Sequence, residues 1–383
     1  MLEARFFDSI NDVDPAQWDA LFGDGHPFTR HAFLHALEAS GSVSAQTGWQ
    51  PSHLVLFDAG RALAAMPLYV KAHSWGEFVF DWAWAEAYER HGLSYYPKLV
   101  TAVPFSPVEG PRLGLGANEP SGALLEALLE AIRDRVAELG ASGWHLLFPE
   151  RSLTDRLGAQ DTAGELLQRR DVQFQWFNHG YRCFEAFLAS LRSARRKNIR
   201  RERRRIAEQG IVLERRTGEQ ISAAEWADFY ACYRETYHRR SGHAGYLTRD
   251  FFQRLLSSAR EQLLLVVARR GERIVGSALF LFDRHNLYGR YWGALEEVSC
   301  LHFEACFYQG IEFCIERGLR RFDPGTQGEH KLIRGFEPVT THSCHWIADP
   351  EFRRAIGSYL QLERRGRERY RQRAAEFLPY RQG

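Results

Sequence analysis

Three adjacent residues near the carboxyl end of the sequence carry side chains that could move a proton and stabilise a negative charge. Glu329, His330 and Lys331 follow a glycine-containing loop, and Asp323 ends the strand that we expect before this loop. A carboxylate or a neutral imidazole can accept a proton from an amine, and a lysine ammonium can stabilise a developing oxyanion. We therefore treat these four residues as candidate catalytic groups. The alternative is a polar turn whose charges only cap and solvate the chain.

Lysine is rare in this chain. Of its 50 basic residues only four are lysines, namely Lys71, Lys98, Lys197 and Lys331. Either Lys or Arg serves as a surface cation, so a chain that uses Arg almost everywhere keeps lysine where a compact, titratable ammonium is needed. Each of the four lysines is therefore a pointer to function, against the alternative of chance.

The densest charge lies on a segment, 184–209, that we expect to form one long helix with an apolar stripe on one face. Its basic residues include Arg196, Lys197 and Arg200, which are the candidate phosphate-binding residues. A face of like charges repels itself unless an anion neutralises it, and the phosphate of a nucleotide, a coenzyme A or an RNA backbone would do so. The alternatives are a solvated face and a clamp for acidic side chains elsewhere in the chain.

Two aromatic segments, 78–84 and 288–293, are expected to form strands that line a groove. Their candidate binding residues are Asp81, Trp84, Tyr291 and Trp292, with Trp82 beside them. The alternative is that these aromatic residues belong to the hydrophobic core, as aromatic stripes more often do. A buried carboxylate such as Asp81 needs a partner, so this residue is harder to assign to a core.

A helix is expected over 301–317, and because it is apolar nearly all round we expect it to be buried. His302 and Glu304 stand at its start, next to the edge of the predicted sheet, and both are candidate ligand-binding residues. The alternative is that Glu304 only complements the helix dipole and that His302 is a satisfied, half-buried histidine.

The composition is that of an ordinary globular chain. The 383 residues carry a formal net charge of +2 and are 45% hydrophobic and 26% charged, which excludes a disordered, collagen-like or coiled-coil protein. No apolar run approaches the roughly 20 residues of a membrane helix, and the N-terminus lacks the order of a signal peptide. The six cysteines show no CxxC spacing, so we expect a reduced, cytoplasmic protein.

We expect no metal site. The nearest pattern is HSCH, in which His342 and Cys344 share one face of a strand while His345 points to the other. No second pair of ligands has a matching spacing. Nucleophile-elbow, Walker and Rossmann motifs are also missing from the sequence.

The sequence repeats one order of elements. LTRDFFQRLLSSA at 247–259 matches FTRHAFLHALEAS at 28–40, with four identical residues at an offset of 219. A β-hairpin follows each copy, around Gly60 in the first and Gly271 in the second. An aromatic strand and a helix come next, at 77–91 in the first copy. This repeated order predicts a duplicated α/β unit.

Local signals predict further helices. Pro15 suits the first turn of a short helix that Asp14 can cap. Thr29 is placed to cap the next helix, which Gly41 ends. The apolar spacing over 120–139 predicts a third, amphipathic helix.

These segments together resemble the FemAB-like branch of the GNAT acyltransferase superfamily. RRKNIRRERRRIAEQGIVL is similar to a basic helix of Fem-type proteins, and LHFEACF to RGFEPV is similar to the helix, the YDFGG strand and the FK.GFG loop of this family. Lys331 matches the Lys of that loop and Asp323 the Asp of that strand. His330 stands where the family has Phe.

The resemblance implies an α/β (α+β) protein of two tandem GNAT-like domains, each a mixed, mainly antiparallel sheet flanked by helices. We place the N-terminal domain at 1–175 and the C-terminal domain, with the basic helix and a C-terminal helix, at 176–383. It also implies transfer of an acyl or aminoacyl group to an amine. In Fem proteins the donor is aminoacyl-tRNA and the acceptor is a peptidoglycan precursor. The missing glycine-rich pyrophosphate loop before 301–317 argues against acetyl-CoA as the donor.

The sequence therefore favours an N-acyltransferase without a tightly bound cofactor, with aminoacyl-tRNA or acyl-CoA as cosubstrate and a small-molecule or peptide amine as acceptor. Donor phosphates would bind the 196–200 face, Lys331 would stabilise the oxyanion, and His330 or Asp323 would take the proton. Two alternatives stay open: an acyl-CoA-dependent GNAT N-acetyltransferase and a non-catalytic RNA- or nucleotide-binding module. The second has no need of residues 323–337.

Overall fold

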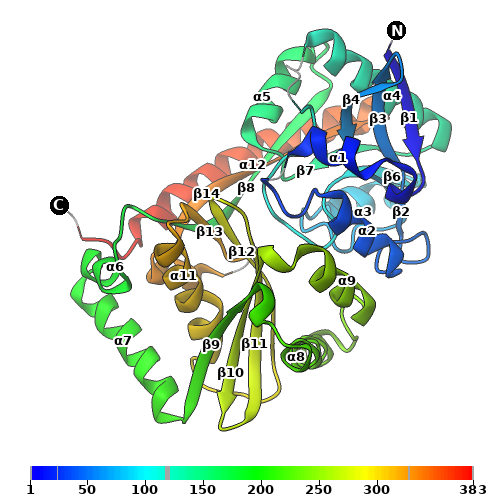
Figure 1. Ribbon diagram of the computed structural model, residues 1–383. Helices are drawn as coiled ribbons and strands as arrows, with labels where there is room; N and C mark the ends of the chain where they lie inside the picture. Colours follow the sequence, from blue (N-terminus) through cyan, green and yellow to red (C-terminus); the bar gives the residue numbers. More distant parts are fainter. Residues whose placement is uncertain (1, 24, 117–120, 327, 382–383) are drawn as a thin grey trace. The chain divides into compact units, whose positions relative to one another are not determined.

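The computed structural model describes residues 2–23, 25–116, 121–326 and 328–381, and it divides into two compact units (Figure 1). Unit 1 comprises Met1–Asp171 and Thr340–Arg369, and unit 2 comprises Val172–Val339 and Tyr370–Gly383. The sequence analysis places the boundary after residue 175 and assigns 340–369 to the C-terminal domain. In the structure these residues pack with unit 1 instead.

Unit 1 contains two sheets, with strand orders β1-β3-β4 and β2-β5-β6-β7-β14. The β6–β7 pair is parallel and the other pairs described in this unit are antiparallel. The strands are β1 (Leu2–Phe7), β2 (Trp49–Pro51), β3 (His53–Asp58), β4 (Arg61–Met66), β5 (Leu68–Lys71), β6 (Lys98–Thr101), β7 (Gly143–Leu147) and β14 (Glu337–Ile347).

The helices of unit 1 follow the predicted apolar spacing in most places. The amphipathic helix α4 buries the face formed by Leu124, Leu128 and Ile132 against the sheet core, and Asp14 caps α1 by accepting from the Gln17 N–H at 2.8 Å. The helices are α1 (Pro15–Phe22), α2 (His31–Ala39), α3 (Trp82–Arg90), α4 (Gly122–Leu139) and α5 (Arg151–Gln160).

Unit 2 is built on one sheet with the strand order β8-β13-β12-β11-β10-β9. Helices α8 and α9 lie on one side of this sheet and α11 on the other (Figure 1). The strands are β8 (Leu166–Phe177), β9 (Ile211–Thr217), β10 (Leu263–Arg270), β11 (Arg273–Phe282), β12 (Asn286–Ala294) and β13 (Arg321–Asp323). The helices are α6 (Phe184–Ser190), α7 (Ser193–Glu208), α8 (Ala223–Ser241), α9 (Arg249–Ala259), α10 (Leu301–Phe303) and α11 (Gln309–Arg317).

Apart from β2, β5 and α3, which unit 1 has in addition, both units present the same order of main elements, which confirms the duplication. The order β1, α1, α2, β3, β4, β6, α4, β7 in unit 1 corresponds to β9, α8, α9, β10, β11, β12, α11, β13 in unit 2. Both hairpins turn at a glycine with positive φ, 81° at Gly60 and 58° at Gly271, and both carry a bulge near the turn. One detail of the predicted alignment is wrong: β6 and α4, and not 77–91, are the counterparts of β12 and α11.

Several local predictions need correction, and each has a long-range cause. The segment expected as one helix over 184–209 is two helices, because the chain turns at Leu191 and Arg192, whose N–H donates to Pro379 O at 2.8 Å. Residues 78–81 form no strand, and Phe78 has a positive φ of 61°.

Two further corrections concern helix ends and helix type. Thr29 does not cap α2; instead Asp19 accepts the His31 N–H at 2.8 Å. The helix expected over 301–317 is buried as predicted, but a π-helical turn, Glu304–Tyr308, separates α10 from α11.

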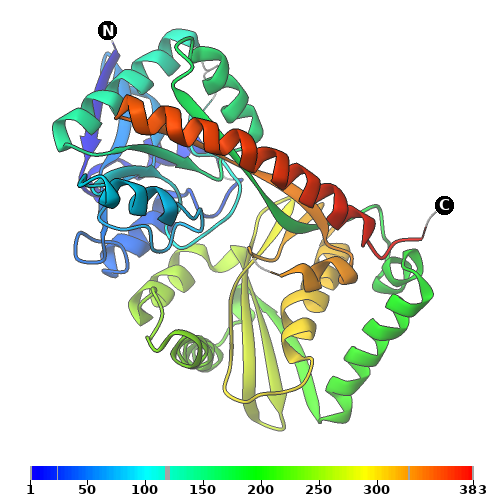
Figure 2. The same ribbon diagram turned by 180° about the vertical axis from the view of Figure 1, so that it is seen from behind.

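Three elements belong to both units. Strand β8 begins in unit 1 and ends in unit 2, and β14 begins in unit 2 and ends in unit 1. Helix α12 (Pro350–Glu376), orange to red in Figure 2, also starts in unit 1 and ends in unit 2. Among the described helices, none is both long and apolar enough to cross a membrane.

Candidate active site

The sheet of unit 2 opens where its two parallel strands part. Strands β12 and β13 are paired as far as Tyr288 and Asp323, where β13 ends while β12 continues to Ala294. The Asp323 carboxylate lies at this opening, almost fully buried, and accepts from Arg290 Nη2 at 3.1 Å and from the Gly325 N–H at 2.9 Å. Both of its oxygens are therefore engaged, which favours a positioning role over that of a free base.

Lys331 lies near Asp323 and Arg290, with which it interacts electrostatically. It belongs to the 3-10 helix Glu329–Arg334, is only 2% exposed, and donates from Nζ to Gly325 O at 2.5 Å. Burial lowers the pKa of Lys331 to about 8, and the nearby Arg290 adds to this effect while Asp323 opposes it. An ammonium whose proton is held this loosely can donate to a ligand and titrates close to neutral pH.

Two histidines lie beside Lys331. The His330 ring is 6.2 Å from the His302 ring, and both rings contact Phe307. Burial lowers the pKa of His302 to about 4, and His330 adds to the shift. Burial also lowers the pKa of His330, helped by the positive charges of Lys331 and Arg334. Both rings are therefore neutral at pH 7, and His330 is also exposed and able to meet a substrate.

Arg334 holds the 3-10 helix in place. Its guanidinium donates to His330 O at 2.8 Å, to Tyr308 Oη at 2.9 Å and to Glu202 Oε1 at 2.7 Å. It also lies 3.5 Å from the centre of the Phe303 ring. Sequence reasoning missed Arg334, since nothing in its local spacing pairs it with a carboxylate 132 residues away.

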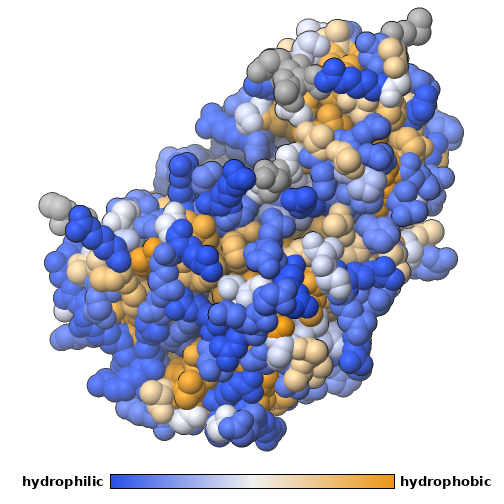
Figure 3. Space-filling view, viewed as in Figure 1, coloured by the Kyte–Doolittle hydropathy of each residue, from blue (hydrophilic) through white to orange (hydrophobic). Residues whose placement is uncertain are grey.

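The basic helix α7 supplies both ion pairs and free cations. Arg203 donates to Glu304 and Glu312, and Arg200 donates to Glu185 at 2.5 Å, as the clamp alternative anticipates. Burial raises the pKa of Glu304, while Arg203 opposes the shift. Among the described residues, Arg196 and Lys197 form no ion pair. This face of the molecule is mostly hydrophilic over α7 (Figure 3).

The structure brings together only part of the predicted set. The Trp292 and His302 rings are 5.6 Å apart, so Trp292 belongs to the Lys331 site. Tyr291 faces the other way and packs on Phe252 at 5.4 Å. Glu329 is exposed and accepts from Tyr370 Oη at 2.7 Å, which leaves it outside the opening.

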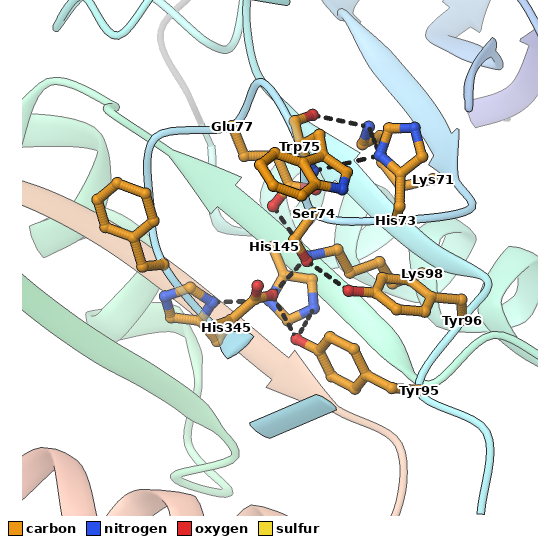
Figure 4. Close-up of polar contacts among 12 residues, drawn as sticks. Lys71, His73, Ser74, Trp75, Glu77, Tyr95, Tyr96, Lys98, His145 and His345 are labelled. Atoms are coloured by element: carbon orange, nitrogen blue, oxygen red, sulfur yellow. Dashed lines mark hydrogen bonds and ion pairs between the residues drawn. The ribbon is translucent and has the colours of Figure 1, made fainter. Parts of the chain in front are cut away.

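Asp81 and Trp84 belong to unit 1, where a second polar cluster surrounds Lys98 (Figure 4). Lys98 is completely buried, and its Nζ donates to Ser74 Oγ and Glu77 Oε2, each at 2.8 Å, and to Asp81 Oδ2. Burial raises the pKa of Glu77 to about 7, whereas Lys98 and His145 hold the pKa of Asp81 below its ordinary value against the effect of burial. Trp84 packs on the ring of His345 at 4.9 Å.

A chain of hydrogen bonds extends from this cluster across the sheet. Tyr95 Oη donates to Asp81 Oδ2 at 2.6 Å, the Nδ1 atoms of His145 and His345 are 2.7 Å apart, and His345 Nε2 is 2.9 Å from Ser343 Oγ. Burial lowers the pKa of both histidines. Sequence reasoning pointed to Lys98 as one of the rare lysines but missed Glu77 and the two histidines.

The described residues hold no group of three His, Cys, Asp or Glu side chains that could bind a metal ion. In β14, Cys344 and His345 are buried and His342 is partly exposed.

The order of elements in both units and the opening beside Lys331 define a protein of two GNAT-like units in tandem. The chain belongs to the FemAB-like family, whose model is described as peptidoglycan biosynthesis/recognition and matches residues 9–382. This membership and the fold indicate an acyltransferase of the GNAT/Fem type. No curated protein matches the chain.

Several solved structures share this fold at low sequence identity. A structure of FemX covers 93% of this chain and 100% of its own, with 11% identity and a TM-score of 0.53. L-PGS from Bacillus licheniformis covers 91% of this chain and 97% of its own, with 12% identity and a TM-score of 0.53. The C-terminal domain of a putative lysylphosphatidylglycerol synthetase from Agrobacterium fabrum covers 90% of this chain and 95% of its own, with 10% identity and a TM-score of 0.53.

Proposed function

We propose that this protein transfers an acyl or aminoacyl group to an amine acceptor at the opening between β12 and β13. The observation that carries the proposal is Lys331, a buried ammonium whose hydrogen bond goes to a backbone carbonyl and not to a carboxylate. Such a group can donate to the oxyanion that forms when an amine attacks a carbonyl. Arg290 donates to Asp323, and Asp323 in turn accepts from the N–H of Gly325, the residue whose carbonyl Lys331 contacts.

The proton that the acceptor amine must lose goes to His330 in this proposal. The ring is neutral at pH 7 and exposed, and it stands next to Lys331 in the sequence. Asp323 is a poorer acceptor because Arg290 and the Gly325 N–H already occupy its oxygens. Glu329 is engaged by Tyr370 and lies outside the opening.

The donor binds through phosphates on the free cations of α7, chiefly Arg196 and Lys197. Glu202, on the same helix, accepts from Arg334, which also holds the carbonyl of His330. A phosphate-bearing donor, aminoacyl-tRNA in the first instance and acyl-CoA as the alternative, would therefore bind close to the catalytic turn. A peptidoglycan precursor is the acceptor class that the family description supports.

A binding and turnover screen tests the proposal. The full chain is incubated with aminoacyl-tRNA or acetyl-CoA and with a UDP-linked sugar peptide that carries a free amine, and acylated peptide is measured by mass spectrometry. We expect transfer with one donor and loss of transfer in Lys331→Ala. Binding of tRNA without any transfer in every combination would favour the non-catalytic RNA-binding module instead.

A further inference from the structure

Two buried carboxylate oxygens beside Lys98 in unit 1 have no hydrogen-bond partner among the described residues. They are Oε1 of Glu77 and Oδ1 of Asp81, in residues that are only 4% and 3% exposed. The other oxygen of each carboxylate accepts from Lys98 Nζ. A buried acceptor without a donor is costly, and native proteins leave few of them. We therefore expect a hydrogen-bond donor from outside the protein to bind these two oxygens.

The two lysines of this region do not supply those donors. Lys98 Nζ already donates to three oxygens, on Ser74, Glu77 and Asp81, which is all that an ammonium can do. Lys71 Nζ donates to Trp75 O at 3.3 Å, lies 3.4 Å from His73 Nδ1 and sits 3.7 Å from the centre of the Trp49 ring. Within the described part of the chain Lys71 forms no ion pair.

The segment that carries these carboxylates presents aromatic rings to solvent. Trp75 is 58% exposed, Phe80 59% and Trp82 39%, and the rings of Trp75 and Trp82 are 5.0 Å apart. Phe78, between the two carboxylates, has a φ of 61°, a conformation that costs a bulky residue free energy. Figure 4 shows Trp75 and Glu77 on the same loop above Lys98.

We propose that residues 72–82 bind a ligand through a primary ammonium group that donates to Glu77 Oε1 and Asp81 Oδ1. An ammonium brings three donors and no acceptor, which suits two free carboxylate oxygens, whereas a carboxylate brings none. The exposed indoles suit the alkyl chain and the positive charge of such a ligand. This site lies in unit 1, goes beyond the proposed transfer at Lys331, and its test measures binding and not turnover.

Binding of a positively charged ligand at this site should change the protonation of the protein, which can be measured. Burial raises the pKa of Glu77 to about 7 and lowers the pKa of Lys71 to about 7, so both groups are partly protonated at neutral pH. A bound ammonium favours ionised Glu77 and neutral Lys71, so binding at pH 7 releases protons. The other titratable groups that face the site are Lys98, Asp81, His73, Tyr95, Tyr96 and His145.

Calorimetric titration of the full chain tests the proposal, with n-pentylammonium chloride as the probe and 1-pentanol and sodium pentanoate as matched controls. We expect saturable binding of the amine alone, with heats that depend on the ionisation enthalpy of the buffer. Glu77→Gln keeps an oxygen for Lys98 but turns the free acceptor into a donor, so it should weaken binding by roughly tenfold or more. Trp75→Ala should also weaken binding, and Glu89→Gln, an exposed carboxylate of α3, should not.

Several results would overturn the proposal. One is equal binding of 1-pentanol or pentanoate, and another is the absence of saturable amine binding to the wild-type protein. A third is unchanged affinity in a Glu77→Gln protein that melts at the wild-type temperature. The comparison of probes and buffers on the wild-type chain needs no variant, so it decides the question even if Glu77→Gln does not fold.

Discussion

Lys71 in β5 and Lys98 in β6 are direct cross-strand partners, and neither residue is exposed to solvent. Two like charges in this arrangement would repel each other in a medium that screens them poorly. The two lysines avoid this repulsion because only Lys98 has carboxylate partners. Although burial opposes it, Glu77 and Asp81 raise the pKa of Lys98, whereas burial without a carboxylate partner lowers the pKa of Lys71 to about 7. Only one of the two lysines is thus firmly charged at neutral pH.

Replacing Lys71 by Met should stabilise the protein, and more so at low pH. The folded-state pKa of Lys71 is depressed, so the unfolded chain binds this proton more tightly and the wild-type protein loses stability as pH falls from about 10.5 to about 7. Lys71→Met removes this loss, so the free energy of unfolding at pH 6 should rise by about 1–4 kcal/mol. Urea unfolding at pH 6 and pH 9 measures the difference. Lys197→Met, on an exposed helix face, is the control, and an equal gain at both pH values would contradict the argument.

Lys331→Ala should lower turnover by about 100- to 1,000-fold, because an oxyanion donor acts in the transition state more than in the bound substrate. The apparent substrate constant should change much less. Lys331→Arg should rescue only part of the rate, since a planar guanidinium places its protons elsewhere. Steady-state kinetics with the donor and acceptor found in the screen provide the measurement. Full turnover in Lys331→Ala would return the residue to a purely structural role.

The rate should depend on pH in a bell shape. A neutral His330 base is lost as pH falls below its lowered pKa, and the Lys331 ammonium is lost as pH rises through about 8. His330→Gln should remove the acid limb and leave the alkaline limb in place. An acid limb that persists in His330→Gln would assign the proton transfer to another group.

Arg334 and Arg200 offer a matched comparison of a buried and an exposed ion pair. Arg334→Ala leaves the partly buried Glu202 without its charged partner, although Tyr308 Oη still donates to it, and this should cost about 3–5 kcal/mol of unfolding free energy. Arg200→Ala breaks a pair whose two side chains are 55% and 65% exposed, and it should cost about 0–1 kcal/mol. Chemical denaturation of both variants measures the contrast. Similar losses would mean that Arg334 contributes no more than a surface residue.

The triple variant of Arg196, Lys197 and Arg200 to Ala should weaken the binding of a phosphate-bearing donor and leave the fold intact, because the apolar face of α7 is unchanged. If the donor is a tRNA, each lost phosphate contact should flatten the dependence of log affinity on log salt by about 0.7–0.9. Filter binding over a range of salt concentrations measures the slope. If the slope of log affinity against log salt is unchanged, the basic face of α7 is only a solvated surface.

The elements that the sequence predicts well are those whose signals are local. Asp14 lies next to the helix that it caps, the apolar face of α4 repeats within one segment, and the turns at Gly60 and Gly271 need only a residue that tolerates positive φ. The turn around Lys331 could also be singled out as a candidate site from adjacent residues. The protein keeps three of its four lysines buried, so their rarity in the sequence carried structural information.

The predictions that failed depend on contacts between distant segments. The break between α6 and α7 follows from Arg192 donating to Pro379 O, near the other end of the chain. The His145–His345 contact joins residues 200 positions apart, and no spacing rule connects them. Residues 78–81 form no regular strand, because Asp81 accepts a hydrogen bond from Lys98 in β6. In each case a tertiary partner overrides the local preference.

The late position of β14 in the sequence also fixes an order of events during synthesis. The edge of β7 is completed by residues 343–347 of β14, which leave the ribosome only after all of β9 to β13. Unit 1 therefore cannot finish its sheet cotranslationally, and its nascent form presents an open strand edge until the C-terminal segment arrives. A chain truncated before residue 340 would keep that edge permanently and should depend on chaperones or aggregate, although every helix of the first 171 residues is present.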